Sequence, residues 1–516
     1  MSRTTKCITN SKFAFLYYFA NLLLGFVSRK VFINYVGVEV LGLNQTAQNL
    51  LGFLNLAELG IGSAIAFTLY KPIADNDQNS INEIVTVQGY LYRRIACFVG
   101  MGGLVMMSFF PWMFDKAELP LWYAYTSFGV FLYSSLLTYF VNYKQIILSA
   151  SQQEYLITKS YHFVMLAKSA IQILAMMYLP YPYVTWLVLQ VIFATLASWN
   201  LNRTISKTFP ELKVNLSEGK LLMKKYHTII TKVKQLFFHA IGGFVLTQTS
   251  SIIIYGFTTL TMVAIYGNYM LIANCIRMLF NAVFTSVTAG IGNLVVEGNK
   301  KRMIEVFEEL FSSRFLIITS FLYCFLVMSN SFMVLWVGPK FVLDMPTVWV
   351  IVGTMYIILS RTTVDAYLSA TGLFQDIWAP IAEAVLNIGL SVLLGYLFGI
   401  TGVLSGVFLS IFFVIFIWKP IFLFRSGLKV SLWIYIRMYM KHVAALLIAY
   451  VSSEIIFSCV QIPVDTYFVW GISTIAHYIS FTLILFILLY LTSQGMRDFT
   501  SRIKGIVNNK IYKSRI

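Results

Sequence analysis

The chain has 516 residues, of which 58% are hydrophobic and only 11% are charged, and its mean hydropathy is +0.75. Soluble proteins carry roughly 25% charged residues, so this composition excludes a water-soluble globular protein and indicates one that is embedded in a membrane. The formal net charge of +17 would suggest nucleic-acid binding in a soluble protein, but in a membrane protein it first indicates cytoplasmic loops.

Apolar runs bounded by charged or turn residues recur along the whole chain. A helix needs about 20 such residues to cross about 30 Å of hydrocarbon, and by this rule we predict about 14 membrane-spanning helices in an all-α polytopic membrane protein. In chain order they cover residues 13–35, 43–69, 91–113, 121–143, 160–180, 183–201, 236–257, 261–285, 314–337, 345–368, 379–399, 402–420, 442–462 and 467–491.

The Lys and Arg residues are distributed unevenly between the two sides of these spans. Of the 38, 31 fall on the side that holds both termini, including Arg314 at the start of the ninth span. The positive-inside rule therefore predicts that both termini are cytoplasmic. We interpret the strongly basic connection 202–235 as a solvated linker held near anionic lipid rather than as a site for a specific ligand.

Four features of the sequence recur at an offset of about 220 residues, which is typical of transporters built from internal repeats. We predict two six-helix lobes in the same orientation, related by a pseudo-two-fold axis along the membrane normal. The paired features are 41–44 with 263–266, Arg93-Arg94 with Arg314, 148–151 with 368–371, and Arg203 with Arg425. The predicted divisions are an N-terminal lobe at 1–201, the basic linker at 202–235, a C-terminal lobe at 236–425, two extra spans within 426–491 and a basic tail at 492–516.

Little in the chain suggests an enzyme. The outward connections are short, and their few acidic residues are spread over several loops, so a membrane polymerase or glycosyltransferase is disfavoured. The five cysteines are scattered, and no phosphate-binding loop sequence is present. We therefore expect no catalytic residue, no metal site and no cofactor.

Basic residues inside the spans are the first functional candidates, because an ionisable group at the bilayer centre costs at least about 2.5 to 3.5 kcal/mol and normally faces a cavity or a partner. Arg277 lies 16 residues into its span with no acidic residue within a helical turn or two. It either contacts an anionic substrate in a cavity or forms an interhelical ion pair. Arg29, which lies near the outer end of its span, and Lys168 are further candidates, although Arg29 could also snorkel to the interface.

Acidic residues inside the spans are candidates for coupling transport to an ion, either H⁺ or Na⁺. Glu58 lies among small residues and either pairs with a cation or carries a proton. Arg361 and Asp365 are four residues apart on one helix face, so they either neutralise each other or serve as an anion contact and a coupling site. Glu383 is close to the start of its span and either has a coupling role or reaches the cytoplasmic interface.

The chain resembles the polysaccharide transporter branch of the multidrug/oligosaccharidyl-lipid/polysaccharide (MOP) exporter superfamily, the Wzx-type flippases of O-antigen and capsule assembly. The resemblance covers essentially the whole chain. The passages that carry it read RKVFINYVG at 29–37, LGLN at 41–44, LAELGIG at 56–62, LYKP at 69–72, VAIYGNY at 263–269 and IGN at 291–293.

This resemblance implies two six-helix bundles around a V-shaped central cavity with a basic lining. It also implies a multi-pass protein of the bacterial inner membrane that transports a polyprenyl-pyrophosphate-linked oligosaccharide, with the polymerase and glycosyltransferases of the same pathway as partners and no nucleic acid. The family's membrane-embedded basic positions match Arg29 and Arg277, whereas the pair Arg361 and Asp365 is not part of the family's pattern.

The resulting hypothesis is alternating access. The pyrophosphate binds Arg277, Arg29, Lys168 and Arg361, and the empty carrier returns with an ion at Glu58, Asp365 or Glu383. A cation-coupled multidrug exporter of the same fold is the main alternative, and a membrane polymerase or glycosyltransferase is a more distant one.

Overall fold

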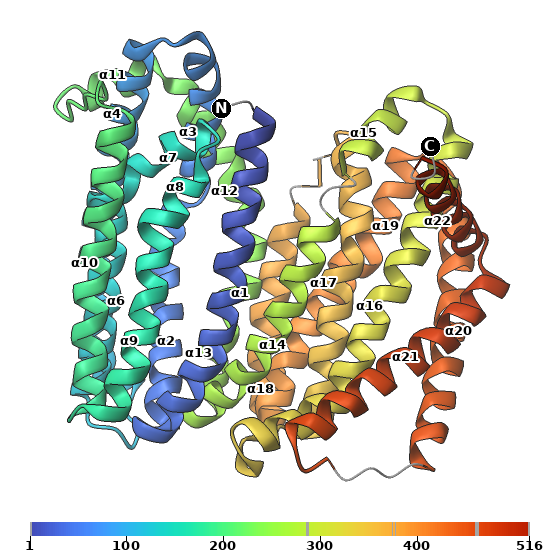
Figure 1. Ribbon diagram of the computed structural model, residues 1–516. Coiled ribbons are helices and arrows are strands. Elements are labelled where there is room, and N and C mark those ends of the chain that lie inside the picture. Colours follow the sequence, from blue (N-terminus) through green and yellow to red (C-terminus); the bar gives the residue numbers. More distant parts are fainter. Residues whose placement is uncertain (1–2, 285–287, 374, 377, 460–463, 514–516) are drawn as a thin grey trace. The chain divides into compact units, whose positions relative to one another are not determined.

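The computed structural model describes residues 3–284, 288–373, 375–376, 378–459 and 464–513 (Figure 1). All regular elements in these residues are helices. Eight of the described helices are long and apolar enough to cross a membrane, or nine if the bent pair Trp122–Phe140 and Asn142–Ala150 counts as one span. The prediction of an all-α multi-pass membrane protein is thus confirmed.

The chain divides into two compact units, residues 1–267 and 268–516, which we describe one at a time. The longer helices that lie in the first unit are α1 (Arg3–Tyr35), α2 (Val38–Leu54), α3 (Ile61–Asp75), α4 (Gln78–Ser108), α6 (Trp122–Phe140), α9 (Phe163–Tyr178), α10 (Pro182–Thr208), α12 (His227–Gln248) and α13 (Ser250–Phe257). Shorter elements between them are η1 (Asn55–Glu58), α5 (Phe110–Met113), η2 (Asn142–Gln145), α7 (Ile146–Ala150), α8 (Glu154–Ile157), η3 (Thr158–His162) and α11 (Gly219–Lys225).

Helix α14 (Leu260–Phe284) begins in the first unit and ends in the second. The second unit continues with α15 (Thr288–Glu297), α16 (Lys300–Trp336), η5 (Pro339–Phe341), α17 (Met345–Ala370), α18 (Trp378–Ile411), η6 (Phe412–Trp418), α19 (Lys419–Phe422), η7 (Leu423–Gly427), α20 (Leu432–Ser458), α21 (Tyr467–Thr492) and α22 (Gln494–Lys513).

The span predicted at 43–69 is interrupted in the first unit. Helix α2 ends at Leu54, the short turn η1 follows, and Gly60 adopts a φ of +85° before α3 begins. Non-helical backbone at membrane depth is tolerated only where protein or a water-filled cavity surrounds it. Here Asn55 Oδ1 accepts hydrogen bonds from Ser135 Oγ at 3.0 Å and Tyr139 Oη at 2.8 Å. Side chains of α6 therefore hold the break in place.

The internal repeat is visible in where the helices begin. Helices α2 and α14 begin at residues 38 and 260, and α4 and α16 at 78 and 300, which is a difference of 222 in both pairs. The N-caps also correspond. Asp77 accepts a hydrogen bond from the Ser80 amide and Asn299 one from the Arg302 amide, each at 3.1 Å. The same local signal, an acceptor three residues before the amide that it caps, thus starts both long helices.

The basic connection predicted at 202–235 is partly helical. It contains α11, and α12 already begins at His227, before the span predicted at 236–257; that span bends at Thr249 into α13. Helix α12 packs against α2 and α3, and α13 packs against α2, so both lie in the first unit. The division into lobes at this linker stays a prediction.

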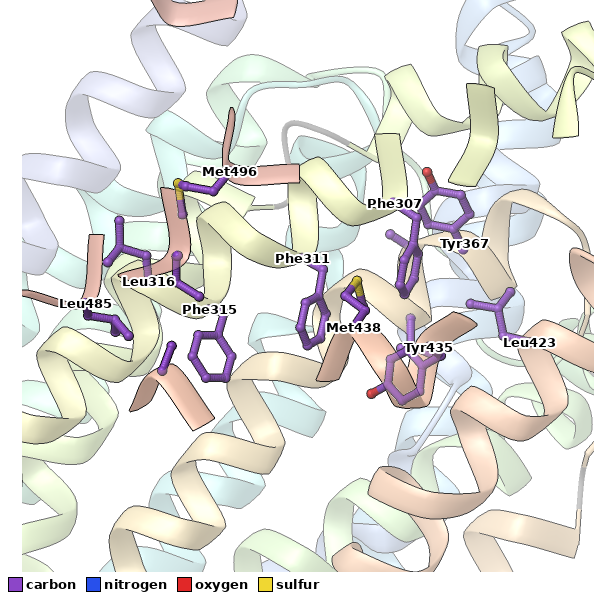
Figure 2. Close-up of a cluster of buried hydrophobic side chains, with 14 of the residues drawn as sticks. Phe307, Phe311, Phe315, Leu316, Tyr367, Leu423, Tyr435, Met438, Leu485 and Met496 are labelled. Carbon is purple, nitrogen blue, oxygen red and sulfur yellow. The ribbon is translucent and has the colours of Figure 1, made fainter. Parts of the chain in front are cut away.

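The core of the second unit is built around α16, which is the most deeply buried of the candidate spans in the described part of the chain. Phe307, Phe311 and Phe315 recur every four residues and line one face of this helix (Figure 2). Tyr435 of α20 packs against Phe307 and Phe311, and Met496 of α22 is fully buried in the same cluster. Lipid tails are as apolar as these side chains, so close packing rather than water exclusion stabilises the membrane-embedded part.

Helix α18 contains two antiparallel segments. The first corresponds to the span predicted at 379–399, and the second continues through η6 into α19 and corresponds to the span predicted at 402–420. Phe398 and Gly399 have non-helical backbone angles and form the bend between them. The second segment lies so close to the first that a Cβ atom on Gly406 would overlap the backbone of Ser391. A small residue at this position is therefore a condition for the hairpin.

We predict that Gly406→Ala lowers the melting temperature of the detergent-solubilised protein, because overpacking against a backbone costs about 1 to 3 kcal/mol. Gly389→Ala is the matched control, since it lies on the same helix with no atom within 4 Å of the added Cβ. The control should leave the melting temperature unchanged or raise it, because Ala favours helix more than Gly does. Equal melting temperatures for both variants would show that the two segments are not this close.

Within the first unit, a polar contact joins the linker to helix α4. Lys225 of α11 forms an ion pair with Glu83 of α4 at 2.5 Å, and Tyr226 Oη donates a hydrogen bond to the same carboxylate at 2.7 Å. The hydrogen bond from Lys225 is the largest of the causes that lower the pKa of Glu83 below its ordinary value. Because this pKa is depressed in the folded state, the contact stabilises the fold above the unfolded pKa of about 4.3 and is lost as the pH falls through the folded pKa.

At pH 8 we expect Glu83→Gln to accelerate trypsin cleavage in the linker roughly twofold, because an exposed ion pair contributes only a little to stability. The control is Glu211→Gln, which removes the same charge from the linker outside this contact. Cleavage by pepsin should also rise in the wild type, but not in Glu83→Gln, as the pH falls below 4.3. Identical cleavage rates of the two variants would contradict the contact.

Candidate functional site in the membrane-embedded charges

Arg29 connects three helices of the first unit. Its Nη2 atom donates hydrogen bonds to the Ala264 carbonyl of α14 at 3.0 Å and to Gln45 Oε1 of α2 at 3.3 Å. Gln45 Nε2 in turn donates to Ser251 Oγ of α13 at 3.2 Å. The side chain thus links α1 to α2 and α14. These oxygens are uncharged, so the contacts solvate the guanidinium and leave its positive charge in place.

Arg277 lies on α14 in the second unit and its side chain is half-buried. Within the described residues it makes no hydrogen bond or ion pair, so the interhelical ion pair that we considered from the sequence is not observed there. A guanidinium presents five N–H donors in a planar fork that matches phosphate or carboxylate oxygens. Arg277 therefore has the donors that an anionic ligand would need. Its assignment as an anion contact stays a prediction.

Lys168 and Glu58 occupy separate places in the first unit. Lys168 Nζ on α9 donates a hydrogen bond to Gln190 Oε1 on α10 at 2.7 Å. Glu58 accepts a hydrogen bond from Tyr92 Oη on α4 at 2.8 Å. In the described part of the chain Glu58 has no cationic partner, so the first of its two predicted roles is not observed. The structure does not bring Lys168, Glu58 and Arg29 into one contact network.

Arg361 and Asp365 form the ion pair that their spacing predicts. Arg361 Nε lies 2.6 Å from Asp365 Oδ2, on one face of α17. Glu383 on the neighbouring helix α18 is only 7% exposed, and Arg361 and Asp365 both lie within its electrostatic reach. The two roles considered for Glu383 stay predictions. These three predicted residues are brought together in the second unit.

Two further charged contacts were not predicted from the sequence. Arg314, which we counted as a cytoplasmic cation, is 4% exposed and donates hydrogen bonds to Thr363 Oγ1 at 3.0 Å and the Phe284 carbonyl at 3.1 Å. Lys419 pairs with Asp376 at 2.8 Å, and both side chains are largely buried. The pair of Lys419 and Asp376 could have been found from the sequence. The predicted spans 379–399 and 402–420 are joined by a very short connection, so the start of the first and the end of the second lie side by side.

A groove with aromatic walls lies in the second unit between α16, α17, η6, α20 and α21, and we name it the aromatic groove. Its volume is about 430 Å³, and its walls include Tyr323, Trp349, Tyr356, Phe412, Tyr439 and Leu446. Five of its lining side chains carry a hydroxyl group, and two of these groups are joined by the hydrogen bond from Tyr439 to Tyr356 at 3.0 Å. A groove of this size and composition suits a hydrocarbon chain or another apolar ligand.

The described residues contain no group of three or more His, Cys, Asp or Glu side chains that could hold a metal ion. The charged side chains instead offer guanidinium and ammonium donors in the first unit and at Arg277, and a mixed acid and base cluster around Arg361. Chemically, such an arrangement can bind an anion or a proton.

Comparison with solved structures places the fold among membrane transporters. The chain matches the structure described as lipid II flippase MurJ in an inward closed conformation, with a TM-score of 0.64 and 12% identity over 93% of this chain and 98% of that one. It also matches an inward-facing multidrug resistance MATE family transporter of the MOP superfamily, with a TM-score of 0.56 and 11% identity over 81% of this chain and 95% of that one.

No protein-family model and no curated protein sequence matches the chain. At these identities the likeness concerns the arrangement of helices, because the sequences share little. The comparison confirms the all-α fold class, because the chain shares its arrangement of helices with the MurJ and MATE structures.

Proposed function

We propose that the protein is a flippase that moves a polyprenyl-pyrophosphate-linked oligosaccharide across the bacterial inner membrane, for O-antigen, capsule or exopolysaccharide synthesis. The observation that carries this proposal is Arg277, a half-buried guanidinium deep in α14 that has no ion-pair partner within the described residues. Keeping such a cation in a span is costly, and a function that needs an intramembrane anion contact explains why it is there.

The chemistry of the substrate fits the two kinds of surface that the chain offers. A pyrophosphate is a dense anion that planar guanidinium groups bind through paired hydrogen bonds. A polyprenyl chain is a long hydrocarbon, and the aromatic groove offers about 430 Å³ of apolar space in the second unit. The oligosaccharide carries many hydroxyl groups and needs a water-accessible path. A cationic drug would be repelled by Arg277 and Arg29, so the multidrug exporter is the weaker proposal.

The transport step follows from the energetics of the head group. Burying an unpaired anion in hydrocarbon costs tens of kcal/mol by Born estimates, so the bare pyrophosphate does not cross a lipid bilayer at a useful rate. Contacts to Arg277 and Arg29 replace part of its hydration while the protein changes the side to which the site opens. In this proposal Lys168 and Arg361 are secondary contacts. Arg361 is already paired with Asp365, and its release requires that this ion pair opens.

Return of the empty carrier needs a driving force that acts when the substrate is gone. Glu58 and Glu383 are the acids that we propose for this role, with Asp365 coupled to Glu383 through Arg361. Glu58 accepts its hydrogen bond from a neutral phenol, so it can take up a proton without leaving a cation unpaired. We propose H⁺ or Na⁺ as the coupling ion and assign both termini to the cytoplasm.

The proposal is tested by binding of polyprenyl pyrophosphate to the purified protein in nanodiscs, with the polyprenol of the same length as the control ligand. We expect wild type to bind the pyrophosphate more tightly. Arg277→Gln should weaken this binding about tenfold or more, because a charge-assisted hydrogen bond contributes about 1.5 to 3 kcal/mol. Arg277→Lys should lose less, since it keeps the charge and loses only the fork.

Lys116→Gln, which removes one cation from an outward connection, is the matched control and should bind like wild type. Full restoration of surface polysaccharide by Arg277→Gln in a strain that lacks the wild-type gene, at equal protein level, would contradict the anion contact. Equal affinity of wild type for the pyrophosphate and the polyprenol would contradict the proposed substrate class.

A further inference from the structure

A second ligand site lies on the outer surface of the first unit, at the groove between α4 and the linker. We name it the α4 groove. It has a volume of about 590 Å³ and is lined by Tyr90, Arg93, Arg94, Cys97, Phe98, Met101, Leu216 and Ser217. It contains none of the candidate transport residues. Its two cations lie at one end and its apolar side chains at the other.

Arg93 and Arg94 are both exposed, and within the described residues neither forms an ion pair. The guanidinium of Arg94 lies 4.6 Å from the centre of the Tyr90 ring, which fixes its direction without neutralising it. Two adjacent guanidinium groups next to an apolar surface provide charge complementarity for one phosphate group.

The apolar part of the groove continues along α4 as a stripe of exposed side chains. Phe98, Met101 and Leu104 follow one another at three-residue intervals and are 56%, 63% and 67% exposed. Further along, Trp112 is 74% exposed, as expected of an interfacial residue. Helix α4 continues for 14 residues beyond Arg94, or about 21 Å at 1.5 Å per residue, before it ends at Ser108. This length covers most of the hydrocarbon thickness of a bilayer, so we infer that the arginines lie near the level of lipid phosphates.

The linker forms the wall of the α4 groove that faces α4, and hydrogen bonds hold it there. Asn82 Oδ1 accepts a hydrogen bond from the Lys213 amide at 3.0 Å, and the Asn215 amide donates one to Thr86 Oγ1 at 3.3 Å. A Cβ atom on Gly89 would lie only 2.6 Å from Leu216 Cδ2, so the linker packs directly on α4. The wall is thus pre-formed rather than created by the ligand.

We propose that the α4 groove binds one anionic glycerophospholipid, with its phosphate between Arg93 and Arg94 and an acyl chain along Phe98, Met101 and Leu104. The Ser217 hydroxyl donates to Asn215 Oδ1 and keeps its oxygen lone pairs for a head-group hydroxyl. The bound lipid contacts both α4 and the linker, so it fastens the linker to the membrane surface. This site is independent of the transported substrate.

The test is titration of the purified protein with palmitoyl-oleoyl phosphatidylglycerol, counted by native mass spectrometry, with phosphatidylcholine of the same chains as the control lipid. We expect a first phosphatidylglycerol to bind about tenfold more tightly than phosphatidylcholine, a difference of about 1.4 kcal/mol, because the choline cation of phosphatidylcholine offsets the attraction between its phosphate and the two arginines. Arg93→Gln with Arg94→Gln should abolish this preference. The control variant, Lys220→Gln with Lys224→Gln, removes the same charge from the linker outside the groove. It should keep the preference for phosphatidylglycerol.

Met101→Glu tests the acyl-chain path with both arginines intact. It should weaken binding of the first phosphatidylglycerol severalfold. The substituted side chains are all exposed, and each variant is checked for monodispersity before titration. Equal loss in the two double variants would overturn the site, because net charge alone would then explain binding. Equal affinity of wild type for the two lipids would also overturn it. Displacement of phosphatidylglycerol by stoichiometric polyprenyl pyrophosphate would assign the groove to the transported lipid instead.

Discussion

The high cost of an unsolvated charge in hydrocarbon is the constraint on which this structure depends. Arg29 meets it with a carbonyl and an amide oxygen from two other helices, and Arg314 meets it with a carbonyl and threonine hydroxyls. Both therefore retain their charge while they tie helices together. Arg361 is neutralised by Asp365. Arg277 differs from these three, since within the described residues it has no such contacts, and this difference is why the proposed function centres on it.

The same constraint explains the interruptions in the spans. A break in a membrane helix exposes backbone groups that lipid cannot satisfy, so it has to be surrounded by protein or line a water-filled cavity. The break around Asn55 is supported by Ser135 and Tyr139, and the adjacent Glu58 is held by Tyr92. The carboxyl group of Glu58 thus lies next to the break in the span, and this position is why we propose it as a coupling acid.

The sequence predicts the parts of this arrangement that are set by local geometry. The length of the apolar runs predicted an all-α multi-pass membrane protein, and the four-residue spacing of Arg361 and Asp365 predicted their ion pair. The sequence alone did not predict contacts between distant segments. Nothing near Glu58 points to Tyr92, and the break at Asn55 is stabilised only in three dimensions. Arg314 was predicted only as a charge at the start of a span, because its partners Thr363 and the Phe284 carbonyl lie in distant segments.

The most direct measurement of the central claim is translocation in proteoliposomes that carry a fluorescent polyprenyl-pyrophosphate-linked sugar in both leaflets. A membrane-impermeant quencher reports how much of the label becomes accessible from outside with time. The account predicts that wild type makes the inner-leaflet label accessible, whereas Arg277→Gln at equal protein content behaves like empty liposomes. Translocation by Arg277→Gln at the wild-type rate, or none by wild type under an imposed proton or sodium gradient, would contradict it.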